Sequence, residues 1–144
     1  MTLPIYSALL GAALLVVQNL LMLTVGIYRT RTGKSAGVDG DIKLERLARR
    51  HGNLAENAAI FVAVLTLYEL LAGQTAFALW IALLFAFARL LHIAGFSDQA
   101  GSHLVGAEGS KKIFVMMRGG GAGLSAVASL LLGINLALAA MAVF

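Results

Sequence analysis

Long apolar stretches constrain this chain more than any other feature of its sequence. The first, residues 3–28, has only Gln18 and Asn19 as strongly polar side chains. As a helix rising 1.5 Å per residue, this stretch would be about 39 Å long. A helix needs about 20 apolar residues to cross the hydrocarbon core of a bilayer. The first stretch can therefore span a membrane with some tilt.

Three further stretches of this kind follow. Segment 42–72 has a polar first half and ends before Gly73, a typical helix cap, while 76–96 and 113–143 are apolar with few charges. The polar or turn-prone connections are residues 29–43, 73–75 and 97–112. The sequence therefore predicts an all-α membrane protein, a single domain over residues 1–144 that forms a bundle of four transmembrane helices.

The composition excludes several classes of protein. Hydrophobic residues make up 60% of the 144 and charged residues 12%, against about half and about a quarter in soluble domains. A water-soluble monomer would therefore expose too much apolar surface. The chain has no cysteine, which rules out disulfides and thiolate metal ligands. Its three histidines lack a metal-binding spacing such as HExxH, so we expect no metal site.

The basic residues are concentrated in two places. Most of them lie within residues 29–50, where the aromatic side chains of a nucleic-acid platform are missing, so we expect no nucleic-acid partner. The connections 29–43 and 97–112 hold essentially all Lys and Arg outside the spans. By the positive-inside rule these connections face the cytoplasm, and both termini face the other side of the membrane.

Ionisable side chains at membrane depth are candidates for function, because each is costly in hydrocarbon unless it is paired or faces water. On the second helix such residues fall within an arc of about 80° at helical spacing. The third predicted helix carries two ionisable residues on one stripe. The fourth helix begins with one such residue, and the first helix ends with one at the same depth in the membrane. The candidates are Arg29, Glu45, Arg49, Asn53, Glu56, Arg89, His92 and Arg118. Their convergence would form a mostly cationic pocket suited to an anionic ligand.

Structural roles remain open for some of these residues. Glu45 and Arg49 have the i,i+4 spacing of a helix-surface ion pair. Glu56 and Arg89 could form a buried ion pair that sets helix packing. His92 lies on an otherwise apolar stripe, where a hydrogen-bonded structural histidine is common.

Two other features carry smaller expectations. Residues 119–123, GGGAG, contain a small-xxx-small pair, which favours close helix packing over phosphate binding. Glu69, near the far end of the second helix, is expected to lie at the membrane interface.

The stretch ERLARRHGNLAEN, residues 45–57, resembles the MAPEG family, the membrane-associated proteins in eicosanoid and glutathione metabolism. The likeness is closest to the bacterial branch, in which an HGN-x-x-E pattern opens the second helix. It extends over nearly the whole chain. The resemblance implies a left-handed four-helix bundle in the bacterial inner membrane, assembled as a homotrimer, with glutathione bound between subunits near the cytoplasmic face.

The resemblance also implies roles for individual residues. Arg118 would be catalytic, stabilising the glutathione thiolate. Phe96 stands where glutathione-using relatives tend to carry a tyrosine, so that hydroxyl is absent here. The residues that would hold the tripeptide, with Glu56 facing its amino group and the arginines its carboxylates, are Arg29, Arg49, Asn53, Glu56, Arg89 and His92.

Three functions follow as hypotheses. The first is a membrane glutathione transferase or peroxidase-like enzyme whose second partner is a hydrophobic electrophile or lipid from the surrounding membrane lipids. The second is a non-enzymatic scaffold of the same fold that binds a lipid. The third is a small transporter that uses Glu56 and Glu69 as proton-coupled carboxylates.

Overall fold

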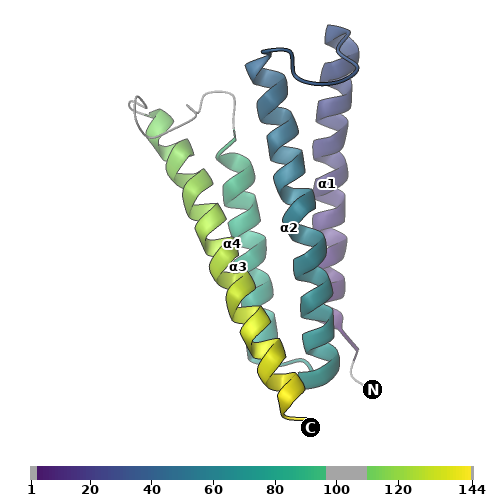
Figure 1. Ribbon diagram of the computed structural model, residues 1–144, viewed down its shortest axis with the longest axis vertical. Helices are drawn as coiled ribbons and strands as arrows, with labels where there is room; N and C mark the ends of the chain where they lie inside the picture. The colour runs from purple at the N-terminus through teal and green to yellow at the C-terminus, as the bar shows by residue number, and fades with distance from the viewer. Residues whose placement is uncertain (1–2, 97–109, 144) are drawn as a thin grey trace.

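A computed structural model describes residues 3–96 and 110–143. Figure 1 shows a bundle of long helices, and no strand occurs in these two ranges. The helices are α1 (Ile5–Thr32), α2 (Ile42–Ala72), α3 (Ala76–Ala94) and α4 (Ser110–Met141). Each of them is long and apolar enough to cross a membrane. The predicted all-α architecture with four candidate spans is confirmed.

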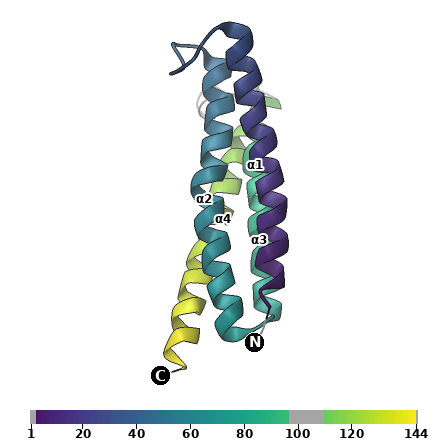
Figure 2. The same cartoon turned by 90° about the vertical axis from the view of Figure 1, so that its right-hand side faces the viewer.

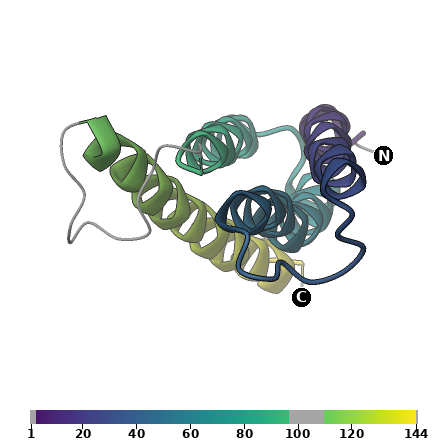
Figure 3. The same cartoon turned by 90° about the horizontal axis from the view of Figure 1, so that it is seen from above.

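The helices run alternately up and down, as Figures 1 and 2 show. One end of the bundle carries residues 33–41, the last turn of α3 and the first turn of α4, and we call it the loop end. The chain termini lie at the opposite end. Packing is most extensive between α1 and α2 and between α3 and α4, and α2 joins the two pairs. Seen from above in Figure 3, α2 lies between α1 and α4, which do not contact each other within the described residues.

Apolar side chains fill the space where the two helix pairs meet. Phe61 of α2 and Phe85 of α3 stack with ring centroids 3.7 Å apart. Leu54, Leu65 and Leu132 are buried beside them. Many large apolar side chains on the outside are exposed, as expected where a bilayer or another subunit covers the surface.

Several helix boundaries differ by a few residues from those predicted. The first helix continues past Tyr28 to Thr32, so Arg29 lies within its last turn and not at its end. The helix stops where Gly33 adopts a left-handed conformation at φ 69°, with its N–H bonded to the Arg29 carbonyl. The basic residues of this turn suit the negative end of the helix dipole. The predicted connection 97–112 falls mostly outside the described residues, and its last three residues form the first turn of α4.

Asp41 fixes the start of α2. Its carboxylate accepts hydrogen bonds from the backbone N–H groups of Lys43 and Leu44 at 3.1 and 3.0 Å, as an N-cap does. It also pairs with Lys34 Nζ at 3.0 Å and accepts from the Tyr28 hydroxyl at 3.2 Å. The Leu44 N–H and the Lys34 ammonium lower the pKa of Asp41. The cap is therefore ionised at neutral pH.

Glu69, near the far end of α2, is fully buried against the start of α1. Its carboxylate accepts hydrogen bonds from the backbone N–H groups of Tyr6 and Ser7, at 3.0 and 2.7 Å. These groups belong to the first turn of α1, whose N-cap residue, Pro4, makes no capping side-chain bond. A carboxylate from α2 thus supplies the cap and the negative charge that the α1 N-terminus favours.

The glycine cluster of α4, residues 119–123, packs closely against α3. The contact is made by Gly121 and not by the small-xxx-small pair that the sequence suggested. A Cβ atom added there would lie 2.6 Å from the His92 nitrogen and 2.7 Å from the Ala88 carbonyl oxygen. Around Gly119 and Gly123, the small-xxx-small pair, nothing lies within 4 Å of such an atom. Only the middle glycine of the cluster is therefore required for the contact between α3 and α4.

Candidate functional site

A polar cleft opens at the loop end, between α2 and the adjoining ends of α3 and α4. It encloses about 330 Å³. A second hollow of about 290 Å³ continues it along α2 and shares Glu45, Arg49 and Asn53 with it. We call the two together the α2 cleft. The first part is lined by Ile42, Glu45, Arg46, Arg49, Asn53, Phe96 and Arg118, and the second adds Val38, Ala48, Gly52 and Glu56.

The polar face of α2 forms one wall of this cleft. Arg49 Nε lies 3.9 Å from Glu45 Oε1, and both side chains are mostly exposed. Asn53 donates from Nδ2 to the Arg49 carbonyl at 2.8 Å, and its side-chain oxygen is a further acceptor in this wall. These residues share a face because they recur every three or four positions along a helix. The wall therefore offers both hydrogen-bond donors and acceptors to a ligand.

Arg118 forms the facing wall, where α4 crosses the end of α3. Its guanidinium carbon lies 5.2 Å from the centre of the Phe96 ring, within the range of a cation–π contact. His92 Nδ1 donates to the Arg118 carbonyl at 2.9 Å. The backbone of Arg118 also lies so close to Gly95 that a Cβ atom there would be 2.7 Å from the Arg118 Cα. These contacts fix the point from which Arg118 enters the cleft.

Arg89 and His92 lie behind the cleft and do not line it. Arg89 is 2% exposed, and it donates to the Asn53 carbonyl at 3.3 Å and to the Gly121 carbonyl at 3.4 Å. Among the described residues Arg89 makes no ion pair with Glu56. The buried Glu56–Arg89 ion pair considered from the sequence is therefore wrong. Because Arg89 and His92 bond to the backbone of Asn53 and Arg118, they hold both walls of the cleft in place.

Glu56 lies at the inner end of the α2 cleft. It borders the second hollow and also a separate cavity of about 270 Å³ between α2 and α4. That cavity is mostly apolar, with Ile60, Phe61, Val64 and Leu132 among its lining residues. Glu56 is thus a carboxylate at the boundary between a polar and an apolar space.

Arg29 lies apart from the α2 cleft within one subunit. Its Nη1 donates to the Gly37 carbonyl at 2.9 Å and to the Lys34 carbonyl at 3.4 Å. Both acceptors belong to the connection between α1 and α2. The side chain therefore braces this connection and does not line the α2 cleft.

Sequence reasoning missed the cationic lining residue Arg46 and the apolar lining residues Val38, Ile42 and Ala48. Arg46 lies three positions before Arg49 and seven before Asn53, so the helical spacing already placed it on the same face. Its guanidinium adds to those of Arg49 and Arg118 against the single carboxylate of Glu45. The outer part of the cleft is consequently cationic and suits a carboxylate-bearing ligand.

One of two comparisons with known proteins supports this architecture. Comparison with curated protein sequences gives no significant match. The profile of the MAPEG family, in contrast, matches residues 7–143, which is nearly the whole chain and includes every residue of the cleft. The chain belongs to the MAPEG family.

Proposed function

We propose that this integral membrane protein binds glutathione in the α2 cleft and activates its thiol toward a hydrophobic electrophile. The observation that carries the proposal is the meeting of Arg49, Asn53 and Arg118 in one polar cleft, although they come from helices far apart in the sequence. Glutathione has two carboxylates and one ammonium group. A cationic outer cleft with Glu56 at its inner end is complementary to that charge pattern.

Arg118 is the proposed catalytic residue. Glutathione supplies a thiol, and a free thiol with a pKa of about 8.5 is only slightly ionised at neutral pH. A guanidinium in a water-poor site favours the thiolate and lowers that pKa. The Phe96 ring beneath the Arg118 guanidinium reduces its access to water. The thiolate sulfur then bonds to the electrophilic atom while that atom's bond to its leaving group breaks. The leaving group departs with the electron pair of that bond, and the thiol proton passes to solvent.

The remaining predicted ligands fit a site shared between subunits of a homotrimer. Arg49 and Glu56 are exposed in the single chain, and a carboxylate at membrane depth requires water or a cationic partner. Arg29 of a neighbouring subunit would contribute from outside the cleft. Arg89 and His92 would act by positioning Asn53 and Arg118. The basic residues of the loop end favour a site on the cytoplasmic side, as in a bacterial inner-membrane protein.

The apolar cavity beyond Glu56 supports a hydrophobic second substrate. Its walls come from α2 and α4, the same helices that carry Arg49 and Arg118. An apolar molecule dissolved in the bilayer could enter there without leaving hydrocarbon. The proposed reaction class is therefore conjugation or reduction of a lipid-like electrophile, as in a transferase or peroxidase.

Thiolate formation tests this function. Glutathione added to the detergent-solubilised protein should produce ultraviolet thiolate absorbance at neutral pH, because Arg118 stabilises the anion. Arg118→Ala should abolish the signal while weak glutathione binding remains. Arg31→Ala is the matched control, since Arg31 lies at the same end but does not line the α2 cleft, and it should leave the absorbance unchanged.

Other results would favour the other hypotheses. Glutathione binding without thiolate absorbance in the wild type would support the lipid-binding scaffold. The transporter hypothesis would gain support from solute flux across the membrane that is driven by a pH gradient. This flux should be independent of glutathione and lost in Glu56→Gln. Equal thiolate absorbance in wild type and Arg118→Ala would remove Arg118 from the catalytic role.

A further inference from the structure

Phe96 places an aromatic ring in the mostly polar outer part of the α2 cleft. It follows the last turn of α3 and lines the cleft together with charged residues of α2. Its backbone N–H donates to the Ile93 carbonyl at 3.2 Å, which fixes the point from which the ring enters the cleft. In the sequence this residue indicated only a missing hydroxyl. In the structure the ring makes contacts of its own, and these indicate what it does.

The Phe96 ring links His92 to the side chain of Arg118. It meets the His92 ring edge to face, with centroids 5.1 Å apart and planes at 67°. This is a favourable arrangement of two aromatic rings. The guanidinium carbon of Arg118 lies 5.2 Å from the centre of the Phe96 ring. At this distance the negative face of an aromatic ring attracts a cation.

Arg118 is therefore held at two points by the end of α3. Its carbonyl accepts from His92 Nδ1 at 2.9 Å, and its backbone lies in close contact with Gly95. Its guanidinium, at the far end of a long flexible side chain, contacts Phe96. Fixing the orientation of an arginine side chain costs conformational entropy. The contact with the ring offsets part of that cost before any ligand binds.

An aromatic ring suits this task better than an acidic side chain would. A carboxylate in the place of the ring would also hold the guanidinium, but its negative charge would oppose the formation of a thiolate nearby. The ring carries no formal charge, so the guanidinium keeps its effect on a thiol. The ring also offers no oxygen acceptor for the N–H groups of Arg118, so these can be directed toward an anion in the cleft.

We propose that Phe96 is a positioning residue for Arg118, which orients the guanidinium toward the thiol of bound glutathione without neutralising its charge. The proposal rests on the proposed glutathione function and adds a residue to it. Phe96 acts through Arg118 and makes no bond to the reacting sulfur. The aromatic ring at position 96 is thus a functional feature of this chain.

The pKa of the bound glutathione thiol tests this proposal on the full-length protein. Ultraviolet thiolate absorbance across a pH series measures that pKa. Replacing Phe96 with trifluorophenylalanine nearly keeps the shape of the ring but removes most of the negative charge on its face. The thiol pKa should then rise by about half a unit, so that about threefold less thiolate forms at a fixed pH below it. Phe96→Leu, which removes the ring, should raise the pKa at least as much.

The other charged groups of this part of the cleft are the same in every variant, so they do not cause a difference between variants. These groups are Glu45, Arg46 and Arg49 of α2. S-methylglutathione, which has no thiol proton, should bind the fluorinated protein as it binds the wild type, because fluorination leaves the ligand contacts in place. Thermal unfolding of each variant checks that it remains folded.

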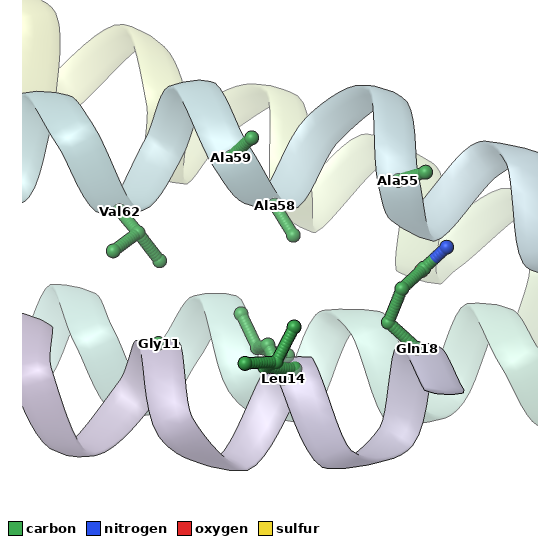
Figure 4. A pocket seen from close by; sticks show the side chains of 8 residues that line it. Gly11, Leu14, Gln18, Ala55, Ala58, Ala59 and Val62 are labelled. Carbon is green, nitrogen blue, oxygen red and sulfur yellow. The ribbon is translucent and has the colours of Figure 1, made fainter. Parts of the chain in front are cut away.

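Two matched controls separate the ring at position 96 from general effects. Trifluorophenylalanine at Phe87, on the same helix but 56% exposed and outside the cleft, should leave the thiol pKa unchanged. Gly11→Ala alters packing in the groove between α1 and α2 that Figure 4 shows, since the added Cβ atom would lie 3.2 Å from Val62 Cγ1. No charged residue lines that groove, so this variant should also leave the thiol pKa unchanged.

The outcomes distinguish this proposal from the proposed function. If the wild type forms no thiolate, the proposed function fails, and the role of Phe96 fails with it. If the wild type forms the thiolate and fluorination leaves its pKa unchanged, Phe96 does not position Arg118, although the proposed function stands. An equal pKa shift in Gly11→Ala would assign the effect to general packing. Weaker binding of S-methylglutathione to the fluorinated protein would mean that the ring holds the ligand itself.

Discussion

Replacing Glu69 with leucine is expected to lower the free energy of unfolding by about 3–5 kcal/mol. The substitution removes the carboxylate that accepts the Tyr6 and Ser7 N–H groups at 3.0 and 2.7 Å. Two donors in the first turn of α1 would lose their charged acceptor in a site that excludes water, and Pro4 offers no replacement. Titration with SDS from a mild detergent, followed by circular dichroism, measures the loss.

Two further variants define the cause of this effect. Glu69→Gln keeps one acceptor oxygen but loses the charge that favours a helix N-terminus, so its loss should be smaller. Glu45→Gln alters an exposed carboxylate on the same helix and should change stability by less than about 0.5 kcal/mol. A Glu69→Leu protein as stable as Glu45→Gln would show that the bonds from Glu69 to α1 add nothing to stability.

Gly121→Ala is expected to destabilise the protein by about 3 kcal/mol and to weaken glutathione binding at the same time. The added methyl group would overlap the backbone of α3 at His92 and Ala88, which cannot move as a flexible side chain can. The helices would have to separate. That movement would disturb the bonds from Arg89 to the Gly121 carbonyl and from His92 to the Arg118 carbonyl. Unfolding and glutathione titration, measured on the same preparation, detect both effects.

Gly123→Ala is the matched control for this variant. Nothing lies within 4 Å of a Cβ atom at position 123, and alanine favours a helix over glycine by up to about 1 kcal/mol. Gly123→Ala should therefore be neutral or stabilising in the isolated subunit. If Gly121→Ala behaved in the same way, the close crossing of α3 and α4 would not be needed for folding or for the site.

The features that the sequence predicted correctly depend on one helix at a time. Apolar length identifies each span, and the spacing of Glu45, Arg49, Asn53 and Glu56 fixes a shared face whatever the neighbours are. Gly73 ends α2 at positive φ as expected, because a glycine cap acts locally. All these inferences hold without knowledge of tertiary packing.

The features that the sequence did not predict depend on how helices rotate against each other. Arg89 bonds to the backbone of α2 and α4 and not to Glu56, because its stripe on α3 faces the point where those helices meet. Glu69 caps α1 only because α1 and α2 are antiparallel. This arrangement brings the end of α2 beside the start of α1, although the residues are more than 60 positions apart in the sequence. The uncapped start of α1 at Pro4 was the available signal for this contact.

Binding of S-methylglutathione tests the central claim most directly. This ligand keeps the carboxylates and the ammonium group of glutathione but cannot form a thiolate, so its affinity reports recognition alone. In calorimetric titrations we expect wild-type protein to bind it and Arg49→Ala to bind it at least tenfold more weakly, as the loss of a charge-assisted hydrogen bond implies. Arg31→Ala should bind like the wild type. Equal affinities of wild type and Arg49→Ala, or no binding to any of the three, would contradict a glutathione site in the α2 cleft.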